Sequence, residues 1–163
     1  MNYRTGIGYD VHRFAPGRKL MLGGIEVKHD RGLDGHSDAD VVLHAICDAL
    51  LGAAGKGDIG EHFPPGDPNF KNISSSLLLK KVCGFVAEAG YEAVNVDVVI
   101  LAEEPHLKEY KPKMRAHIAA QIGLSEDAVN IKATTNEGMG FVGNREGIAS
   151  YASVLITKKS MGK

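Results

Sequence analysis

Segments with the apolar spacing of α-helices alternate with strand-like segments along this chain, and this alternation limits its fold most strongly. The clearest helical pattern runs over Val41–Leu50, where apolar residues recur every three or four positions. Ser37 is the predicted N-cap, and Asp40 three residues later completes the pattern of a capping box. Gly52 and Gly55 are expected to end this helix.

The other segments alternate in the same way. The predicted elements are an extended segment Tyr3–Phe14, a hairpin of Leu20–Leu22 and Ile25–Val27 around Gly23–Gly24, helices Ser74–Ala89 and Glu109–Ile122, and strands Val94–Ala102, Ala128–Ala133 and Ile148–Lys158. The segments 29–38 and 55–68 are expected to be loops. This order predicts an α+β (mixed α/β) fold, in which helices pack on one face of a mixed sheet. A chain of 163 residues without an evident linker is expected to form a single domain over 1–163.

The last predicted strand carries apolar groups on both of its faces. Tyr151 and Leu155 alternate with Ala152, Val154 and Ile156. We therefore expect one face to lie under helices and the other to contact another subunit.

Charge and composition exclude several classes of protein. The formal net charge is -1 and the charges are of mixed sign, which argues against a nucleic-acid partner. No apolar run approaches the ~20 residues of a membrane helix, and the N-terminal segment lacks the apolar stretch of a signal peptide. The two cysteines, Cys47 and Cys83, form no metal-binding pair and are expected to be buried thiols. We expect a cytoplasmic protein without a membrane partner.

A metal site is predicted from three side chains. Asp10 and His12 stand two positions apart in an extended segment, so both point to one face of a strand. His44 lies on the first helix, from which it can reach the same face. Two imidazoles and one carboxylate with an open fourth position are typical of catalytic zinc. Asp40 or Asp48, one helical turn from His44, could accept the second ring N–H of His44.

Three loops carry groups suited to a phosphorylated ligand. His36 and Ser37 lie at the start of the first helix, where backbone N–H groups attract anions; a plain helix cap explains them equally well. The segment Thr134–Gly138 follows a strand and offers two hydroxyls and the carboxylate of Glu137, a ligand type that Mg²⁺ prefers, although polar turns there are common. The segment Asp58–Asp67 could bind a polyol or be an ordinary surface loop.

Taken together, the motifs resemble one family. They are GYDVHRF at 8–14, GHSDADVVLHA at 35–45, DALLGAAGKGDIGEHFP at 48–64 and KATTNEGMGFVG at 132–143. In content, order and spacing this set is similar to the 2-C-methyl-D-erythritol 2,4-cyclodiphosphate synthase family over roughly Tyr3–Thr157.

The resemblance implies a role for each matching residue. Asp10, His12 and His44 correspond to the zinc ligands, and Glu137 to the ligand of a second divalent ion, Mg²⁺ or Mn²⁺. His36 and Thr135 correspond to catalytic groups that stabilise the transition state. The implied substrate-binding residues are Ser37, Asp58, Ile59, Gly60, Phe63, Pro64, Pro65, Gly66, Asp67, Ala102, Glu103, Glu104, Pro105, His106, Leu107, Lys108, Thr134, Asn136, Phe141 and Arg145. Among these, 102–108 would form the cytidine pocket.

The implied reaction is an intramolecular cyclisation in the non-mevalonate route to isoprenoid precursors. The 2-phosphate of 4-diphosphocytidyl-2-C-methyl-D-erythritol 2-phosphate would attack the β-phosphate and release CMP. The resemblance also implies a homotrimer, with the sheets of three subunits facing a central axis and active sites between subunits. A central apolar channel in such a trimer can bind an isoprenoid diphosphate.

Two positions depart from the family pattern. Asn136 stands where threonine is common, and Arg145 stands one position later than the arginine of the usual segment. Three alternatives to a cyclase stay open at the level of the sequence: a zinc hydrolase acting on a nucleotide diphosphate, a trimeric carrier of isoprenoid phosphates, and a protein with a structural metal.

Overall fold

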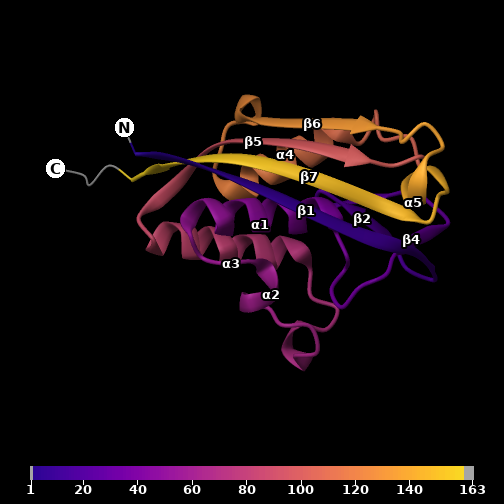
Figure 1. The fold of residues 1–163 in the computed structure, drawn as a ribbon, viewed down its shortest axis with the longest axis horizontal. Helices are drawn as coiled ribbons and strands as arrows, with labels where there is room; N and C mark the ends of the chain where they lie inside the picture. The colour runs from indigo at the N-terminus through magenta and orange to yellow at the C-terminus, as the bar shows by residue number, and fades with distance from the viewer. Residues whose placement is uncertain (1, 160–163) are drawn as a thin grey trace.

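The computed structural model of the protein describes residues 2–159, and its central feature is a mixed β-sheet (Figure 1). The strands lie in the order β4 (Arg31–Leu33), β1 (Tyr3–Pro16), β7 (Gly147–Lys158), β5 (Tyr91–Leu101) and β6 (Val129–Thr134). All neighbours pair antiparallel except β5 and β6, which pair in parallel. A separate hairpin joins β2 (Leu20–Leu22) and β3 (Ile25–Val27), as the Gly-Gly turn predicts.

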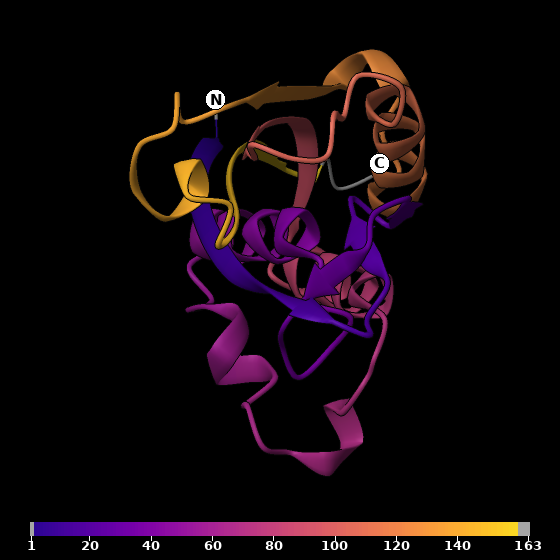
Figure 2. The same ribbon diagram turned by 90° about the vertical axis from the view of Figure 1, so that its right-hand side faces the viewer.

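The three long helices lie on one face of this sheet, which confirms the predicted fold class. Helix α1 (Val41–Ala54) crosses β1 and β7, with α3 (Ser75–Glu88) beside it and α4 (Lys111–Ile122) between β5 and β6 in the chain. Figure 2 shows the segment of α2 (Ile59–His62) and the 3₁₀ turn η1 (Pro68–Phe70) projecting away from the sheet. A second 3₁₀ turn, η2 (Glu126–Ala128), precedes β6, and a short helix, α5 (Gly140–Gly143), precedes β7.

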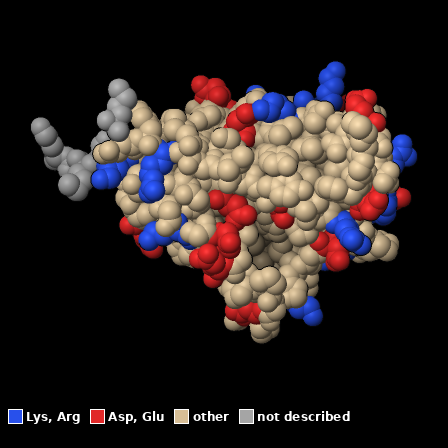
Figure 3. Space-filling model, in the orientation of Figure 1, with Lys and Arg blue, Asp and Glu red and all other residues tan. Residues whose placement is uncertain are grey.

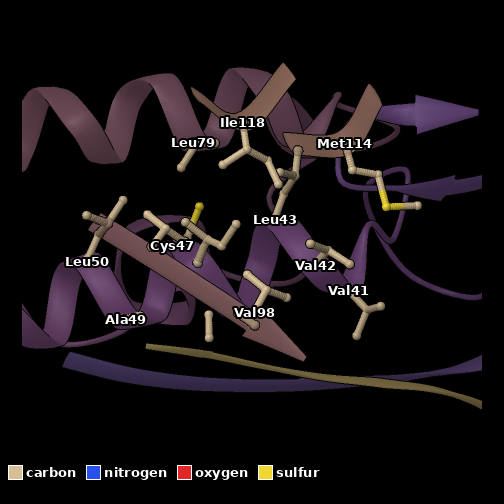
Figure 4. Packing of buried hydrophobic residues seen from close by; sticks show 14 of the residues in the cluster. Val41, Val42, Leu43, Cys47, Ala49, Leu50, Leu79, Val98, Met114 and Ile118 are labelled. Carbon is tan, nitrogen blue, oxygen red and sulfur yellow. The ribbon is translucent and has the colours of Figure 1, made fainter. Parts of the chain in front are cut away.

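The hydrophobic core is built around α1. This helix is enclosed by the sheet on one side and by α3 and α4 on the other, so buried apolar residues occupy nearly its whole circumference. Figure 4 shows Leu43 of α1 beside Ile118 of α4. In the same view Val98 of β5 lies near the strands of the sheet. Because α1 is packed on all sides, a side chain of α1 that points toward the sheet is held in a well-defined position.

The N-terminus of α1 differs from the prediction. Asp40, and not Ser37, is the N-cap, since its carboxylate accepts hydrogen bonds from the N–H groups of Val42 and Leu43. The same carboxylate accepts the N–H groups of Gly23 and Gly24, which ties the β2–β3 hairpin to the helix. The N-cap thus lies three residues later than the sequence pattern predicts. The Ser37 hydroxyl instead accepts the N–H of Ala39.

Other boundaries also shift. Gly52 lies inside α1, and Gly55 alone ends it with a left-handed backbone. The predicted loop 29–38 contains β4, and the predicted loop 55–68 contains α2. These two elements are only three and four residues long, too short for a periodic pattern to reveal them. No helix among residues 2–159 combines the length and apolar character needed to cross a lipid bilayer.

Candidate metal centre and active site

Asp10, His12 and His44 converge at one point between β1 and α1. Asp10 Oδ2 lies 2.9 Å from His12 Nε2 and 2.9 Å from His44 Nδ1, and the two ring nitrogens are 3.4 Å apart. Ligands held ~2.0–2.1 Å from a tetrahedral zinc ion are on the order of 3.3 Å apart. The three atoms therefore lie about as close together as such an ion would hold them.

The donor set fits a divalent metal in its chemistry as well as in its spacing. His12 Nδ1 lies 2.5 Å from the carbonyl oxygen of Asp34 and must donate to it, so the neutral ring of His12 would present its Nε2 lone pair to the other two groups. Each side chain is 12–24% exposed, so an ion can reach the group without full burial of charge. The three side chains lie on one side of the group and a cavity on the other, an arrangement that would leave a bound ion accessible to a ligand in the cavity.

The electrostatics of the group favour an ionised Asp10 carboxylate and a protonated His12 ring. Burial by itself would raise the pKa of Asp10, but hydrogen bonds from His12 and His44 outweigh it and hold this pKa well below its usual range. Burial would lower the pKa of His12, but the hydrogen bond and negative charge of Asp10 raise it above its ordinary value. A divalent cation would take the place of these protons.

The predicted partners of the His44 ring are wrong. The carboxylate of Asp40 accepts backbone N–H groups as the cap of α1, and Asp48 Oδ1 accepts the N–H of Ile59 at 2.7 Å. His44 Nε2 instead lies 2.8 Å from the hydroxyl of Ser75 and 3.2 Å from that of Ser37. Positions one turn away on a helix share a face, but here that face is used for capping and for fixing α2.

A cavity of about 390 Å³ opens above the three ligands. Figure 3 shows the surface hollowed between the body of the molecule and the projecting segment of α2. Of the residues expected to bind substrate, His36, Ser37, Ile59, Gly60, Phe63, Pro64 and Pro65 line this cavity, together with Phe70, Ile73 and Leu78. Asp58 caps α2 through the N–H of Glu61, and Asp67 caps η1 through the N–H of Asn69. The cavity thus has a polar floor and an apolar outer wall.

A second cavity, of about 280 Å³, lies where β5 and β6 end, and β7 separates these two strands from β1 in the sheet. It is lined by Ala102, Glu103, Pro105, His106, Leu107, Lys108, Lys111, Ala133, Thr134 and Thr135. These are the segments predicted to bind the nucleotide and a second phosphate. The topology brings them together because β5 and β6 run in parallel, so the C-terminal ends of the two strands lie side by side.

Glu103 connects the two segments of this second cavity. Its Oε1 accepts the N–H of Asn136 at 2.8 Å and that of Gly138 at 3.3 Å, on either side of Glu137. Glu137 has a left-handed backbone, with φ of 51°, and its carboxylate accepts the Thr135 hydroxyl at 3.0 Å. The Glu103 side chain thus fixes the turn that presents Glu137, in addition to its position in the cavity wall.

Glu104, Phe141 and Arg145 lie outside the lining of both cavities. Glu104 pairs with Arg31 at 2.7 Å and lies 3.6 Å from Arg145 Nε. Phe141 on α5 is 42% exposed. Arg145 is therefore held by an internal carboxylate within this chain.

The two cavities of one chain do not meet. Thr134 pairs with Leu101, Leu101 with Ala149, and Ala149 with Val11, so three strand spacings separate Thr134 from the metal ligands' strand. At ~4.8 Å per spacing this amounts to about 14 Å across the sheet. A single ligand that contacts His44 and Glu137 of one chain would have to span this distance.

Several contributors to the site carry no local sequence signal. Ser75 lies in a run of three serines, and Arg18 donates to the carbonyl oxygens of Gly35 and Ser37 from a loop that precedes β2. The Asp34 carbonyl acts through the backbone, so its residue type is uninformative. These contacts arise only when distant segments pack.

Comparisons with known proteins identify relatives of this chain. The sequence model described as the YgbB family matches residues 3–157. The 2-C-methyl-D-erythritol 2,4-cyclodiphosphate synthase of Symbiobacterium thermophilum is 59% identical over 151 residues, which cover 93% of this chain and 96% of that protein.

Solved structures also match in fold. The bifunctional IspDF of Campylobacter jejuni superimposes with a TM-score of 0.94 at 44% identity, covering 97% of this chain and 43% of that longer chain. IspF of Plasmodium falciparum, solved as a CDP complex, gives a TM-score of 0.85 at 28% identity and covers 98% of both chains.

Proposed function

The chain belongs to the YgbB family, and from this premise we propose that it acts as a 2-C-methyl-D-erythritol 2,4-cyclodiphosphate synthase. The family expected from the sequence motifs is confirmed, and a relative of this name matches nearly the whole chain. The proposed reaction converts 4-diphosphocytidyl-2-C-methyl-D-erythritol 2-phosphate into the 2,4-cyclodiphosphate and CMP. It is a phosphorus–oxygen lyase reaction of the non-mevalonate route to isoprenoids.

One observation carries this proposal: Asp10, His12 and His44 converge at the floor of a cavity that His36 and Ser37 also line. The three ligands would hold zinc or another divalent ion, and Glu137 would hold Mg²⁺ or Mn²⁺. When bound, the two ions would polarise the diphosphate and offset the repulsion between the reacting phosphates. A structural metal site would be closed by a fourth protein ligand, whereas this group faces a cavity.

The protein's own groups position the substrate rather than attack it. The substrate carries its own nucleophile, so no activated serine or cysteine is required. His36, Ser37 and Thr135 supply hydrogen-bond donors where negative charge develops. The apolar wall of Phe63 and Pro64 would cover the methylerythritol part. Bringing the 2-phosphate in line with the β-phosphate is an orientation effect, which can contribute ~7–11 kcal/mol in favourable cases.

The second cavity is the proposed site of the cytidine. Residues 102–108 would contact the base largely through backbone groups, and Thr134 with Asn136 would contact phosphate oxygens. The complex of a Plasmodium falciparum relative with CDP supports a nucleotide ligand of this type.

Separation of the two cavities supports a homotrimer. If the half-site with His44 meets the half-site with Glu137 of a neighbouring subunit, one substrate can contact both without spanning the sheet. The outer face of the sheet carries exposed Ile7, Tyr9, Val11 and Tyr151, which supports burial of this face around a trimer axis.

Three further expectations remain part of the proposal. A central channel formed by this face would be able to bind an isoprenoid diphosphate, with Arg145 near its mouth. The free thiols of Cys47 and Cys83 support a reducing, cytoplasmic location. A continuous apolar core supports a single domain over 1–163, although residues 1 and 160–163 lie outside the described part of the chain.

Phosphorus NMR of the purified protein with its substrate tests the reaction directly. We expect the signals of a cyclic diphosphate and CMP, and loss of both when a chelator removes the metal. His44→Ala should lose the bound metal and lower turnover more than about 100-fold, because a zinc ligand is removed. A linear phosphate product would instead identify a hydrolase, and full activity in metal-free His44→Ala would contradict the proposal.

Glu137→Gln tests the second ion separately. This variant should require higher Mg²⁺ concentrations for half-maximal activity while its zinc content stays unchanged. An unaltered Mg²⁺ dependence would contradict the role of Glu137 and leave the zinc site unaffected.

A further inference from the structure

The N-terminus of α3 reaches the proposed metal site through one buried hydroxyl group. Ser75 is the first residue of α3, its side chain is fully buried, and its Oγ lies 2.8 Å from His44 Nε2. Its two serine neighbours do not share this contact: Ser74 is the N-cap, and Ser76 contacts His117 at 2.9 Å. The Ser37 hydroxyl also lies near His44 Nε2, at the longer distance of 3.2 Å. Ser75 is thus selected by the packing of α3 against α1.

The direction of the hydrogen bonds follows from the partners of Ser75. Its hydroxyl has one hydrogen and a very short contact with Asp38 Oδ1, and its backbone N–H donates to Asp38 Oδ2 at 3.0 Å. An ionised carboxylate only accepts, so the hydroxyl hydrogen points to Asp38. The Ser75 oxygen must then accept from His44, which places the proton of the neutral imidazole on Nε2.

With a cation in place of the proton between these groups, the neutral ring of His44 would present its lone pair on Nδ1, the atom that lies 2.9 Å from Asp10 Oδ2 and 3.4 Å from His12 Nε2. We propose that Ser75 and Asp38 form a positioning pair, which fixes the tautomer and ring orientation of His44 and so sets the affinity of the site for its metal. This inference rests on the proposed metal site and adds two residues to it. Neither residue touches the substrate in this role.

Asp38 also stabilises the fold, so Ser75 is the better position for a test. Asp38 accepts the backbone N–H of Ser75, the first residue of α3, and that of Asp40, the N-cap of α1, at 3.2 Å. Replacement of Asp38 would disturb both helices. Ser75→Ala keeps the backbone hydrogen bond to Asp38 and removes only the hydroxyl.

Ser76→Ala is a matched control on the same helix, because it also removes one serine–histidine contact but not one at the metal site. For the full-length protein, zinc affinity is measured by competition with a chelator, and site geometry by the visible absorption of bound cobalt. We expect Ser75→Ala to bind zinc ~10–100-fold more weakly and to show an altered cobalt spectrum. Ser76→Ala and the parent protein should agree in both measurements.

Wild-type zinc affinity and an unchanged cobalt spectrum in folded Ser75→Ala would overturn this inference alone. Absence of zinc and cobalt binding in the parent protein would instead overturn the proposed metal site, and the inference with it.

Nitrogen NMR of the zinc-loaded parent protein gives a test that needs no variant. The resonances of His44 should show a proton on Nε2 and the metal on Nδ1. A proton on Nδ1 would overturn the inference even if Ser75→Ala failed to fold.

Discussion

Three aspartates near the site have three different physical roles. Asp10 faces the two histidines, Asp38 accepts from Ser75, and Asp40 caps α1 while it holds the β2–β3 hairpin. Asp40 is fully buried, and burial raises its pKa. The same residue type therefore has a proposed role in metal binding at Asp10, a proposed role in orienting His44 at Asp38, and a folding role at Asp40, depending on which groups surround each carboxylate.

Asp40→Ala should lower the free energy of unfolding by ~2–4 kcal/mol. The change removes an N-cap and leaves buried backbone N–H groups of the hairpin and the helix without acceptors. Urea unfolding measures the loss. Ser37→Ala is the control and should stay within about 1 kcal/mol of the parent; equal losses in the two variants would mean that the assignment of the cap is wrong.

The pH dependence of stability should reverse when metal is removed. The pKa of His12 is raised by Asp10, so in metal-free protein this pair stabilises the fold below the unfolded pKa of about 6.5. That contribution is lost as pH rises through the raised pKa of His12. With zinc bound, protons compete with the metal, so stability should rise over the same interval.

Urea unfolding of the parent protein at pH 5.5–8.5, once with chelator and once with zinc, would measure this reversal. The Asp10→Asn variant, measured under the same conditions, is the comparison. Removal of the carboxylate should weaken the metal-free trend, because the hydrogen bond and charge of Asp10 that raise the pKa of His12 are lost, while burial, which lowers this pKa, remains. The same slope in chelator and in zinc would contradict the expectation.

At the scale of elements, two glycines set the distance between β1 and α1. A Cβ on Gly6 would lie 1.9 Å from the carbonyl oxygen of Ala49, and a Cβ on Gly8 would lie 1.9 Å from that of Ala45. Only residues without a side chain allow the strand to lie this close to the helix. This close approach brings His44 of α1 within reach of Asp10 and His12 of β1.

Gly6→Ala should therefore destabilise the protein by about 3 kcal/mol, at the upper end of overpacking effects, since backbone must move. Gly84→Ala is the control: it lies inside α3 with no atom within 4 Å of the added methyl group, and it should stabilise by ~0.5–1 kcal/mol. Chemical unfolding compares the two. A neutral Gly6→Ala would show that β1 and α1 have room to separate.

At the scale of the whole molecule, one face of the sheet lies under helices and the other is open. On β1 the even-numbered residues, Asp10 and His12 among them, point toward α1, whereas Ile7, Tyr9 and Val11 point outward. Tyr9 and Tyr151 are register partners on the outer face, with ring centroids 4.6 Å apart. The helices thus explain the apolar residues on the inner face of β7, and the proposed subunit contact would explain those on its outer face.

Ile7→Glu should convert the proposed trimer to monomers and abolish activity, because Ile7 is 75% exposed on that face and a buried charge there is costly. Sedimentation velocity measures the change. Leu77→Glu is the control, since Leu77 is also an exposed apolar residue, 53% exposed, but lies on α3. A parent protein that sediments as a monomer would contradict the proposed assembly.

The sequence by itself determined the longer elements and the residue types of the proposed metal site. Apolar residues at helical spacing located α1 and α3, and the spacing of Asp10 and His12 placed both on one face of β1. These features depend on neighbours a few residues apart, whose geometry is fixed by the helical and strand repeats. The family resemblance supplied the remaining site residues.

Only the tertiary structure decided which groups meet. Ser75 approaches His44 from 31 positions away, Asp40 accepts from a hairpin 16 and 17 positions earlier, and the halves of the site lie on different strands. Local periodicity carries no information on such contacts, because they depend on how closely whole elements pack. Hydrogen-bond donors in the folded chain, and not the nearest carboxylate in the sequence, therefore determine the role of each aspartate.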